Sequence, residues 1–529
     1  MAATAPVTEY TRKKSSSPVD SAYSQTRIAK NTIVLGLRML VTLVVSLYTS
    51  RVVLSVLGIE DYGLYNIIGG VVILLSVVSN SMTNATQRFI TYELGRSDDR
   101  RVSDVFSMSL IAHIIVCLAI IILGETVGLW YVKTQLNIPE GREAAATAVY
   151  QLSLAAVVIN LIRSPYNASV IAHEKMGFFA LMSIAEVLMK LGIVYILLVV
   201  RYDKLIWYAL LILAIAAVML LCFVVYCHRK FATCDFRFII DKAYFGKLFG
   251  FLGWSLLGST ASLGTQQAGN LIINKFIGVA VNAAYGVANQ VNGAINSFVS
   301  SYQMAFTPQL VKLYSQKRMG EFFDLSKRSA LLSFYLLFIA AFPIILRVDD
   351  ILAVWLVEVP EYAGAFCTLL IIYSLIDAIQ APFWIGINAT GNIKVYEIWL
   401  SAILLLNIPL SIVALRMGMA PYWVLIIRVA LNALTAVIRS IHVKHQLSFP
   451  IRQYVTHVVA RALLVTAVTT ALWFAIPHTS FSSSIPGLII YYAVSVIVIS
   501  AIIWLIGLSN EDRAGVTKLV RQWVGKSQS

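Results

Sequence analysis

Apolar runs of about 20 residues recur along nearly the whole chain. A helix of that length crosses the ~30 Å hydrocarbon core of a bilayer, whereas a membrane barrel would need short strands of alternating polarity, which are absent. We therefore predict an all-α polytopic membrane protein with fourteen transmembrane helices. The predicted spans are 31–57, 63–83, 104–131, 144–163, 177–200, 205–227, 248–275, 278–305, 328–347, 362–388, 394–416, 420–440, 453–476 and 485–508.

Composition agrees with this architecture. Of 529 residues, 59% are hydrophobic and 13% are charged, about half the charged fraction of an ordinary globular domain. The five cysteines show no Cys-x-x-Cys spacing, so we expect neither a disulfide framework nor a metal site. No Walker motif and no nucleophile signature are present, so we expect no enzyme activity and no bound cofactor.

The distribution of basic residues predicts the topology. If the N-terminus lies in the cytoplasm, 29 of the 41 Lys and Arg residues fall in cytoplasmic loops and tails, and 8 fall outside. This positive-inside bias predicts cytoplasmic termini, and affinity for anionic membrane lipids. It also explains most of the net charge of +15 without a nucleic-acid partner.

An internal repeat divides the chain into two halves. Tyr62-Gly63-x-x-Asn66-x-x-x-Gly70 recurs from Tyr285, and a second motif that begins at Asn160 recurs at Asp377, at nearly the same separation. The repeated unit contains six spans, and an even number preserves the orientation of the unit in the membrane. The predicted parts are a polar tail (1–30), two six-helix lobes (31–227 and 248–446) joined by a loop (228–247), two further helices (447–508) and an amphipathic cytoplasmic tail (509–529).

Four spans carry a polar stripe at helical spacing, the two leading spans of each repeated unit. Such stripes either pack helices closely or line a water-filled cavity, and for the amide-rich stripes of 63–83 and 278–305 we favour the cavity. The residues that we predict to line it are Arg38, Thr42, Ser46, Asn66, Asn80, Gln266, Asn270, Asn289, Asn296, Gln303 and, from another span, Arg428.

Few charges lie within the spans. Arg38 has no acidic residue within one turn, so it either binds a phosphate through its planar fork or extends to the cytoplasmic interface. Glu186 and Lys190 are four residues apart and predict a structural salt bridge, whereas Arg163, at the end of its span, is expected at the cytoplasmic rim. Asp377 and Arg428 either pair across the second lobe, or Asp377 is a coupling site for Na+ or H+.

Two stretches resemble polysaccharide flippases of the multidrug/oligosaccharidyl-lipid/polysaccharide exporter superfamily. They are Ser50-Arg51-Val52-Val53-Leu54 through Leu57-Gly58-Ile59-Glu60-Asp61-Tyr62-Gly63-Leu64-Tyr65-Asn66, and Asn274-Lys275-Phe276 through Asn282-Ala283-Ala284-Tyr285-Gly286-Val287-Ala288-Asn289-Gln290. The last two spans are similar to the extra helices of some members, such as the lipid II flippases.

The resemblance implies two lobes arranged as a V and located in a bacterial inner membrane. It implies alternating-access export of an undecaprenyl-diphosphate-linked oligosaccharide, with a polysaccharide polymerase or glycosyltransferases as partners. Cationic cavity residues would bind the diphosphate, and Arg38 is the best match by position. The alternative is a cation-coupled multidrug exporter of the same superfamily, with Asp377 as its buried acid.

Overall fold

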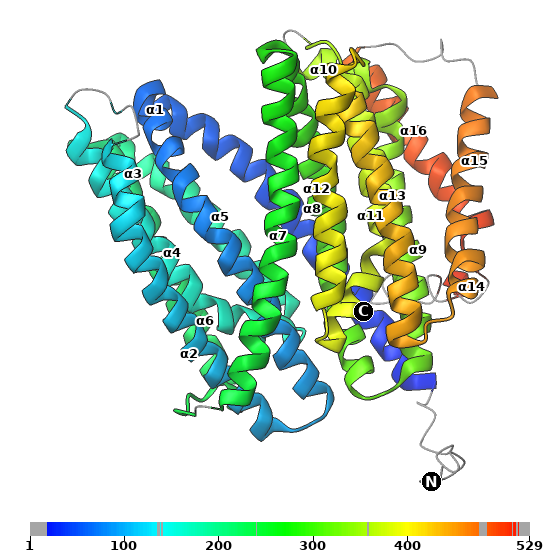
Figure 1. The fold of residues 1–529 in the computed structure, drawn as a ribbon, viewed down its shortest axis with the longest axis horizontal. Coiled ribbons are helices and arrows are strands. Elements are labelled where there is room, and N and C mark those ends of the chain that lie inside the picture. The colour runs from blue at the N-terminus through cyan, green and yellow to red at the C-terminus, as the bar shows by residue number, and fades with distance from the viewer. Residues whose placement is uncertain are drawn as a thin grey trace, which may run out of the picture.

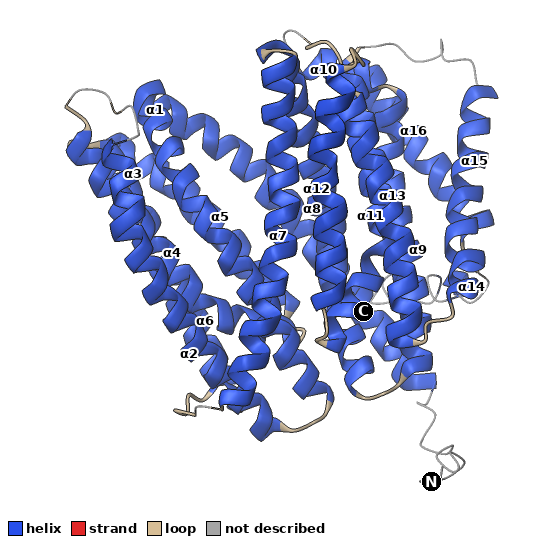
Figure 2. Ribbon diagram, in the orientation of Figure 1, coloured by secondary structure: helices blue, strands red, loops and turns tan. Residues whose placement is uncertain are grey.

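The computed structural model describes residues 18–134, 138, 141–239, 241–356, 359–475, 484–509, 512–514 and 517. Within these residues the chain forms helices joined by short loops, and no strand is found there (Figure 2). The predicted polar tail 1–30 is helical from Pro18 onward. Most of the predicted amphipathic tail 509–529 lies outside the described residues.

The first group of helices contains α1 to α6 (Figure 1). At Gly58 the backbone leaves the helical region (φ 82°, ψ 170°), a conformation that glycine adopts without steric cost, so α1 consists of two helices joined by a sharp bend. This bend separates the predicted spans 31–57 and 63–83. The helices of this group are α1 (Pro18–Gly95), α2 (Asp99–Leu123), α3 (Leu129–Thr134), α4 (Glu143–Ala172), α5 (Met176–Val199) and α6 (Lys204–Lys230).

The second group begins with two long helices that meet at Gly278, where φ is 123°. Pro382 lies inside a helix of this group, as Pro165 does in α4, which agrees with the repeat seen in the sequence. The helices are α7 (Lys242–Phe276), α8 (Val279–Ser315), α9 (Met319–Leu346), α10 (Val348–Trp355), α11 (Ala363–Thr390), α12 (Lys394–Arg416) and α13 (Trp423–Leu447), followed by α14 (Ile451–Tyr454), α15 (Ala460–Ala475) and α16 (Ile485–Ile502).

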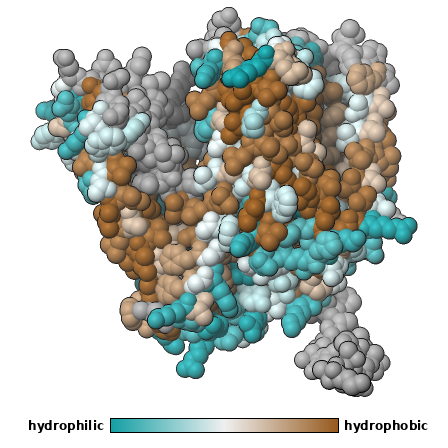
Figure 3. Space-filling model, in the orientation of Figure 1, coloured by the Kyte–Doolittle hydropathy of each residue, from teal (hydrophilic) through white to brown (hydrophobic). Residues whose placement is uncertain are grey.

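The structure confirms the predicted fold class. Each of the fourteen predicted spans corresponds to one helical stretch or to one half of α1. Ten helical stretches are long and apolar enough to cross a membrane, and the remaining predicted spans lie in α1, α7 and α8. A broad apolar band with hydrophilic residues above and below it covers the face in Figure 3, as expected for a multi-pass membrane protein.

The two groups of helices form a V (Figure 1). The helices of the first group lean away from the second group at the end where α3 and α10 lie, and converge with it at the opposite end. Within the groups, α1 packs against α4 and α5, α7 against α12, and α8 against α11, while α1 also contacts α7 and α8 of the second group.

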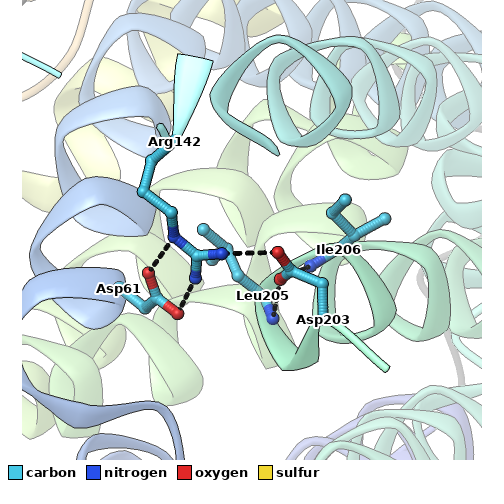
Figure 4. Close-up of polar contacts among 5 residues, drawn as sticks. All are labelled: Asp61, Arg142, Asp203, Leu205 and Ile206. Atoms are coloured by element: carbon cyan, nitrogen blue, oxygen red, sulfur yellow. Dashed lines mark hydrogen bonds and ion pairs between the residues drawn. The ribbon is translucent and has the colours of Figure 1, made fainter. Parts of the chain in front are cut away.

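A three-residue clamp joins the loops at the splayed end of the first group (Figure 4). Arg142 precedes α4 and forms a two-pronged ion pair with Asp61, near the bend of α1. Its Nη1 also donates to Asp203 Oδ2 at 2.5 Å. Because Asp203 caps the N-terminus of α6 through the amides of Leu205 and Ile206, the clamp ties α1, α4 and α6 together.

The C-terminal helices pack on the outer side of the second group. The hydroxyl of Tyr491 on α16 donates to the carbonyl of Pro343 on α9 at 3.2 Å, and Tyr335 of α9 donates to the carbonyl of Gly507 at 3.1 Å. Tyr454 of α14, which is buried, donates to the carbonyl of Ile379 on α11 at 2.5 Å. These bonds fix the two additional helices against α9 and α11.

Candidate functional site

Arg38 lies on the first half of α1 and points toward α5. Its Nη1 donates to Ser183 Oγ at 3.4 Å, and the guanidinium carbon lies 5.0 Å from the centre of the Phe179 ring. Its Nε is buried and has no hydrogen-bond partner among the described residues. A buried charged donor without a partner costs free energy, so Arg38 retains unused capacity to bind an acceptor.

One turn further along the same face of α5, a single carboxylate holds two more cations. Glu186 accepts from Lys190 Nζ at 2.8 Å and from Arg163 Nη1 of α4 at 3.1 Å. The spacing of Ser183, Glu186 and Lys190 places them on one side of α5. We call Arg38, Arg163, Glu186 and Lys190 the cationic cluster.

The cationic cluster carries more positive than negative charge, because it combines three cations with one carboxylate. Charges at membrane depth are costly and mark binding or transport sites, and a positive excess favours an anionic ligand. Guanidinium groups bind phosphates with two parallel hydrogen bonds, which adds geometric specificity to the charge attraction. The arrangement can therefore bind a phosphate-bearing group.

Arg163 is the cluster member that sequence reasoning missed. The predicted span ends at 163, which is why the sequence places Arg163 at the cytoplasmic rim. In the structure α4 continues through Pro165 to Ala172, so Arg163 lies well inside the helix. The predicted Glu186–Lys190 salt bridge is confirmed, but its carboxylate is shared with Arg163.

The second group contains a separate polar network. Arg428 of α13 donates to the Tyr285 hydroxyl at 3.2 Å and lies 4.8 Å from the centre of the Tyr373 ring. The Tyr285 hydroxyl in turn donates to the carbonyl of Gln266 at 3.3 Å. Gln266 Nε2 also donates to Asn289 Oδ1 at 3.4 Å, so three predicted site residues, Gln266, Asn289 and Arg428, come together through Tyr285.

Other predicted cavity residues make local contacts. Asn296 Nδ2 donates to Ser374 of α11 at 3.1 Å, Asn270 donates to Gln267 at 3.4 Å, and the Thr42 hydroxyl donates to the carbonyl of Met39. These bonds agree with helix packing, the alternative reading of the stripes. Ser46 and Asn80 are exposed, Gln303 is half-buried, and the side chain of Asn66 lies outside the described residues.

Asp377 and Arg428 do not pair with each other. Asp377 lies 3.6 Å from Arg439 Nη1, and Arg439 also donates from Nε to the Tyr396 hydroxyl at 2.9 Å. Arg439 is buried, whereas the Asp377 side chain is 47% exposed. Among the described residues, no three His, Cys, Asp or Glu side chains are grouped to hold a metal ion.

Comparison with known proteins places this chain in a family. The family model described as "Polysaccharide biosynthesis protein" matches residues 28–314, more than half of the chain. No curated protein matches the chain in sequence.

Solved structures with the same fold include a MATE in the straight conformation (TM-score 0.70, 14% identity) and an outward-facing multidrug resistance MATE family transporter of the MOP superfamily (TM-score 0.69, 14% identity). A MOP superfamily transporter from Pyrococcus furiosus, described as having a binding pocket of reverse polarity, is similar at TM-score 0.66 and 14% identity. Each comparison covers 82% of this chain and 99% of the other. The chain is thus a multi-pass membrane protein of the polysaccharide biosynthesis protein family, with the fold of the MATE transporters.

Proposed function

We propose that the protein is an exporter that moves a polyprenyl-diphosphate-linked oligosaccharide across the membrane by alternating access between its two groups of helices. The family match and the MATE-like fold support an exporter of the MOP superfamily. The diphosphate-linked substrate is the more specific part of the proposal. It rests on the cationic cluster.

The excess positive charge of that cluster is the observation that carries the substrate assignment. A diphosphate is anionic at neutral pH and offers several acceptor oxygens, which suit the guanidinium groups of Arg38 and Arg163 and the ammonium group of Lys190. Glu186 already bonds to Arg163 and Lys190 and holds both side chains in place. An organic cation, the substrate class of the multidrug alternative, would be repelled by the same three side chains.

The positive-inside bias supports an orientation in the membrane. It assigns the end at which the two groups converge to the cytoplasm. Arg88 and Lys312 contact the opposite group of helices there. The V then opens away from the cytoplasm, as in the outward-facing MATE structure to which the chain is similar. We place the protein in a bacterial inner membrane, between cytoplasmic glycosyltransferases that make the substrate and a polymerase that uses it.

Transport by the purified protein tests the proposal. We would reconstitute it in liposomes and measure translocation of a fluorescent lipid-diphosphate oligosaccharide. Arg38→Ala should lower the rate about tenfold or more, because a charge-assisted hydrogen bond contributes about 1.5–3 kcal/mol. Arg96→Ala is the matched control, because the Arg96 side chain is 58% exposed and pairs with Glu93, which lies near the end of α1.

Two results would contradict the proposal. Unchanged transport in both Arg38→Ala and Lys190→Gln would exclude the cationic cluster as the diphosphate site. Translocation of organic cations together with no movement of the lipid-linked sugar would favour the multidrug alternative.

A further inference from the structure

Basic side chains at the ends of two long helices reach across to the opposite group of helices. We call this region, which contains Arg88, Glu174, Lys312 and Gly391, the closed end. It lies where the two arms of the V converge (Figure 1). Two contacts join the two groups of helices there.

The first crossing contact caps a helix. Arg88, near the end of α1, donates from Nε to the carbonyl of Asn388 at 3.0 Å and from Nη2 to the carbonyl of Ala389 at 2.9 Å. These carbonyls belong to the last turn of α11, which carries partial negative charge and lacks intrahelical donors. Gly391 follows with φ 79°, and a Cβ atom there would lie 2.5 Å from Arg88 Nη2. The glycine therefore permits the close approach of the guanidinium.

The second crossing contact is an ion pair with a buried carboxylate. Glu174 lies in the turn between α4 and α5 in the left-handed region (φ 58°), and its side chain is 3% exposed. Lys312 Nζ, near the end of α8, lies 2.7 Å from Glu174 Oε1, and Gln309 Nε2 donates to Glu174 Oε2 at 3.3 Å. Removing Lys312, which is 26% exposed, would leave the buried Glu174 carboxylate without its cation.

The internal repeat relates these two contacts to each other. The motif pair that aligns Asn160 with Asp377 also aligns Glu174 with Gly391, and both of these residues adopt positive φ in equivalent turns. The motif pair that begins at Tyr62 and Tyr285 aligns Arg88 with the immediate neighbour of Lys312. Each group thus extends its second helix onto the turn between the fourth and fifth helices of the other group, with a basic residue at each contact.

Small side chains lie where α1 meets α7 and α8 of the second group. Ser81 of α1 and Ser259 of α7 have hydroxyl oxygens 3.4 Å apart. Gly95, the last residue of α1, lies so close to Ser315 that a Cβ atom at position 95 would overlap the Ser315 hydroxyl oxygen. The two groups of helices are therefore in close contact where α1 meets α7 and α8.

We propose that these two pseudo-symmetric contacts, Arg88 on the α11–α12 turn and Lys312 with Gln309 on Glu174, form the gate that keeps this side of the transporter shut. Opening toward this side requires both to break. The contacts differ in chemistry, because Arg88 binds backbone carbonyls and Lys312 binds a carboxylate. Neutralising Glu174 or Lys312 therefore weakens one contact and leaves the other intact.

A disulfide between Ser81→Cys and Ser259→Cys reports closure without any substrate, so its result does not depend on the proposed function. In the full-length protein without its five native cysteines, reconstituted in liposomes, we would measure the rate of disulfide formation. Glu174→Gln should slow disulfide formation about fivefold or more, which corresponds to the lower limit of a typical coupling free energy. Glu174→Gln combined with Arg88→Gln should slow disulfide formation further. Lys327→Gln is the matched control, because Lys327 pairs with Asp324 on its own helix.

The charge-exchange variant, Glu174→Lys with Lys312→Glu, tests whether misfolding causes the slower disulfide formation. The exchange should restore at least part of the disulfide rate, because it rebuilds the ion pair in reverse. Wild-type disulfide rates in Glu174→Gln, Arg88→Gln and their combination would overturn the gate. A combined variant no slower than the control would do the same.

Discussion

The clamp at Arg142 gives the most direct prediction about stability. Replacing Arg142 with methionine keeps most of the side-chain volume and removes the charge that bridges Asp61 and Asp203 (Figure 4). The hydrogen-bonded ion pair with Asp61 raises the pKa of the Arg142 guanidinium above its ordinary value, so the arginine stays charged at any pH at which the protein is handled. The substitution leaves two carboxylates facing each other without a cation.

The expected loss follows from the exposure of the three side chains. Breaking a fully buried pair costs about 3–5 kcal/mol, whereas an exposed pair contributes about 0–1 kcal/mol. Arg142, Asp61 and Asp203 are 30%, 19% and 29% exposed, which places the clamp between these limits. We expect Arg142→Met to lower the free energy of unfolding of the first group of helices by about 2 kcal/mol.

Thermal unfolding in detergent measures this loss. A change of about 2 kcal/mol should lower the apparent Tm by about 4 °C. Arg96→Met, which removes an exposed arginine with one ion pair at 3.7 Å, should change the Tm little. In the Arg142→Met background, Asp61→Asn should restore part of the stability by removing one unpaired carboxylate. Equal Tm values for Arg142→Met and Arg96→Met would refute the clamp. So would an Asp61→Asn effect on the Tm that is the same with and without Arg142→Met.

Three further substitutions have defined outcomes. Gly391→Ala should slow formation of the disulfide between Ser81→Cys and Ser259→Cys, because the added Cβ displaces Arg88; an unchanged disulfide rate would contradict this. Gly258→Val should separate α7 from α12 and lower the Tm, because a Cβ at position 258 would overlap the Glu397 carboxylate; an unaltered Tm would show that the contact tolerates the added bulk. Tyr454→Phe removes the hydroxyl that donates to the Ile379 carbonyl of α11 and should cost about 0.5–1.5 kcal/mol, which denaturation of the variant beside the wild type would detect.

Periodicity and charge placement were sufficient to predict the helices. Each apolar run corresponds to a helix because a chain in lipid must satisfy its backbone hydrogen bonds within the segment. The repeat motifs also anticipated real structural parallels, such as the prolines inside α4 and α11. The sharp bend at Gly58 lies between two predicted spans, where the sequence already indicated a boundary.

The partners of the charged side chains could not be predicted in this way. Glu186 and Lys190 are four residues apart, so helical spacing reveals their contact, whereas Arg163 reaches Glu186 from another helix. Glu174 and Lys312 are 138 residues apart, and their pairing depends on how the two groups of helices converge. Local spacing carries no information about such contacts, and the cavity lining predicted from stripes stays a prediction for the same reason.

Transport of the lipid-linked sugar is the measurement that tests the central claim most directly. Purified protein in liposomes should move a fluorescent polyprenyl-diphosphate oligosaccharide from one leaflet to the other. The rate should fall about tenfold or more in Arg38→Ala and stay near wild type in Arg96→Ala. Wild-type protein that moves no such lipid, or Arg38→Ala and Lys190→Gln variants that both move it as fast as wild type, would contradict the account.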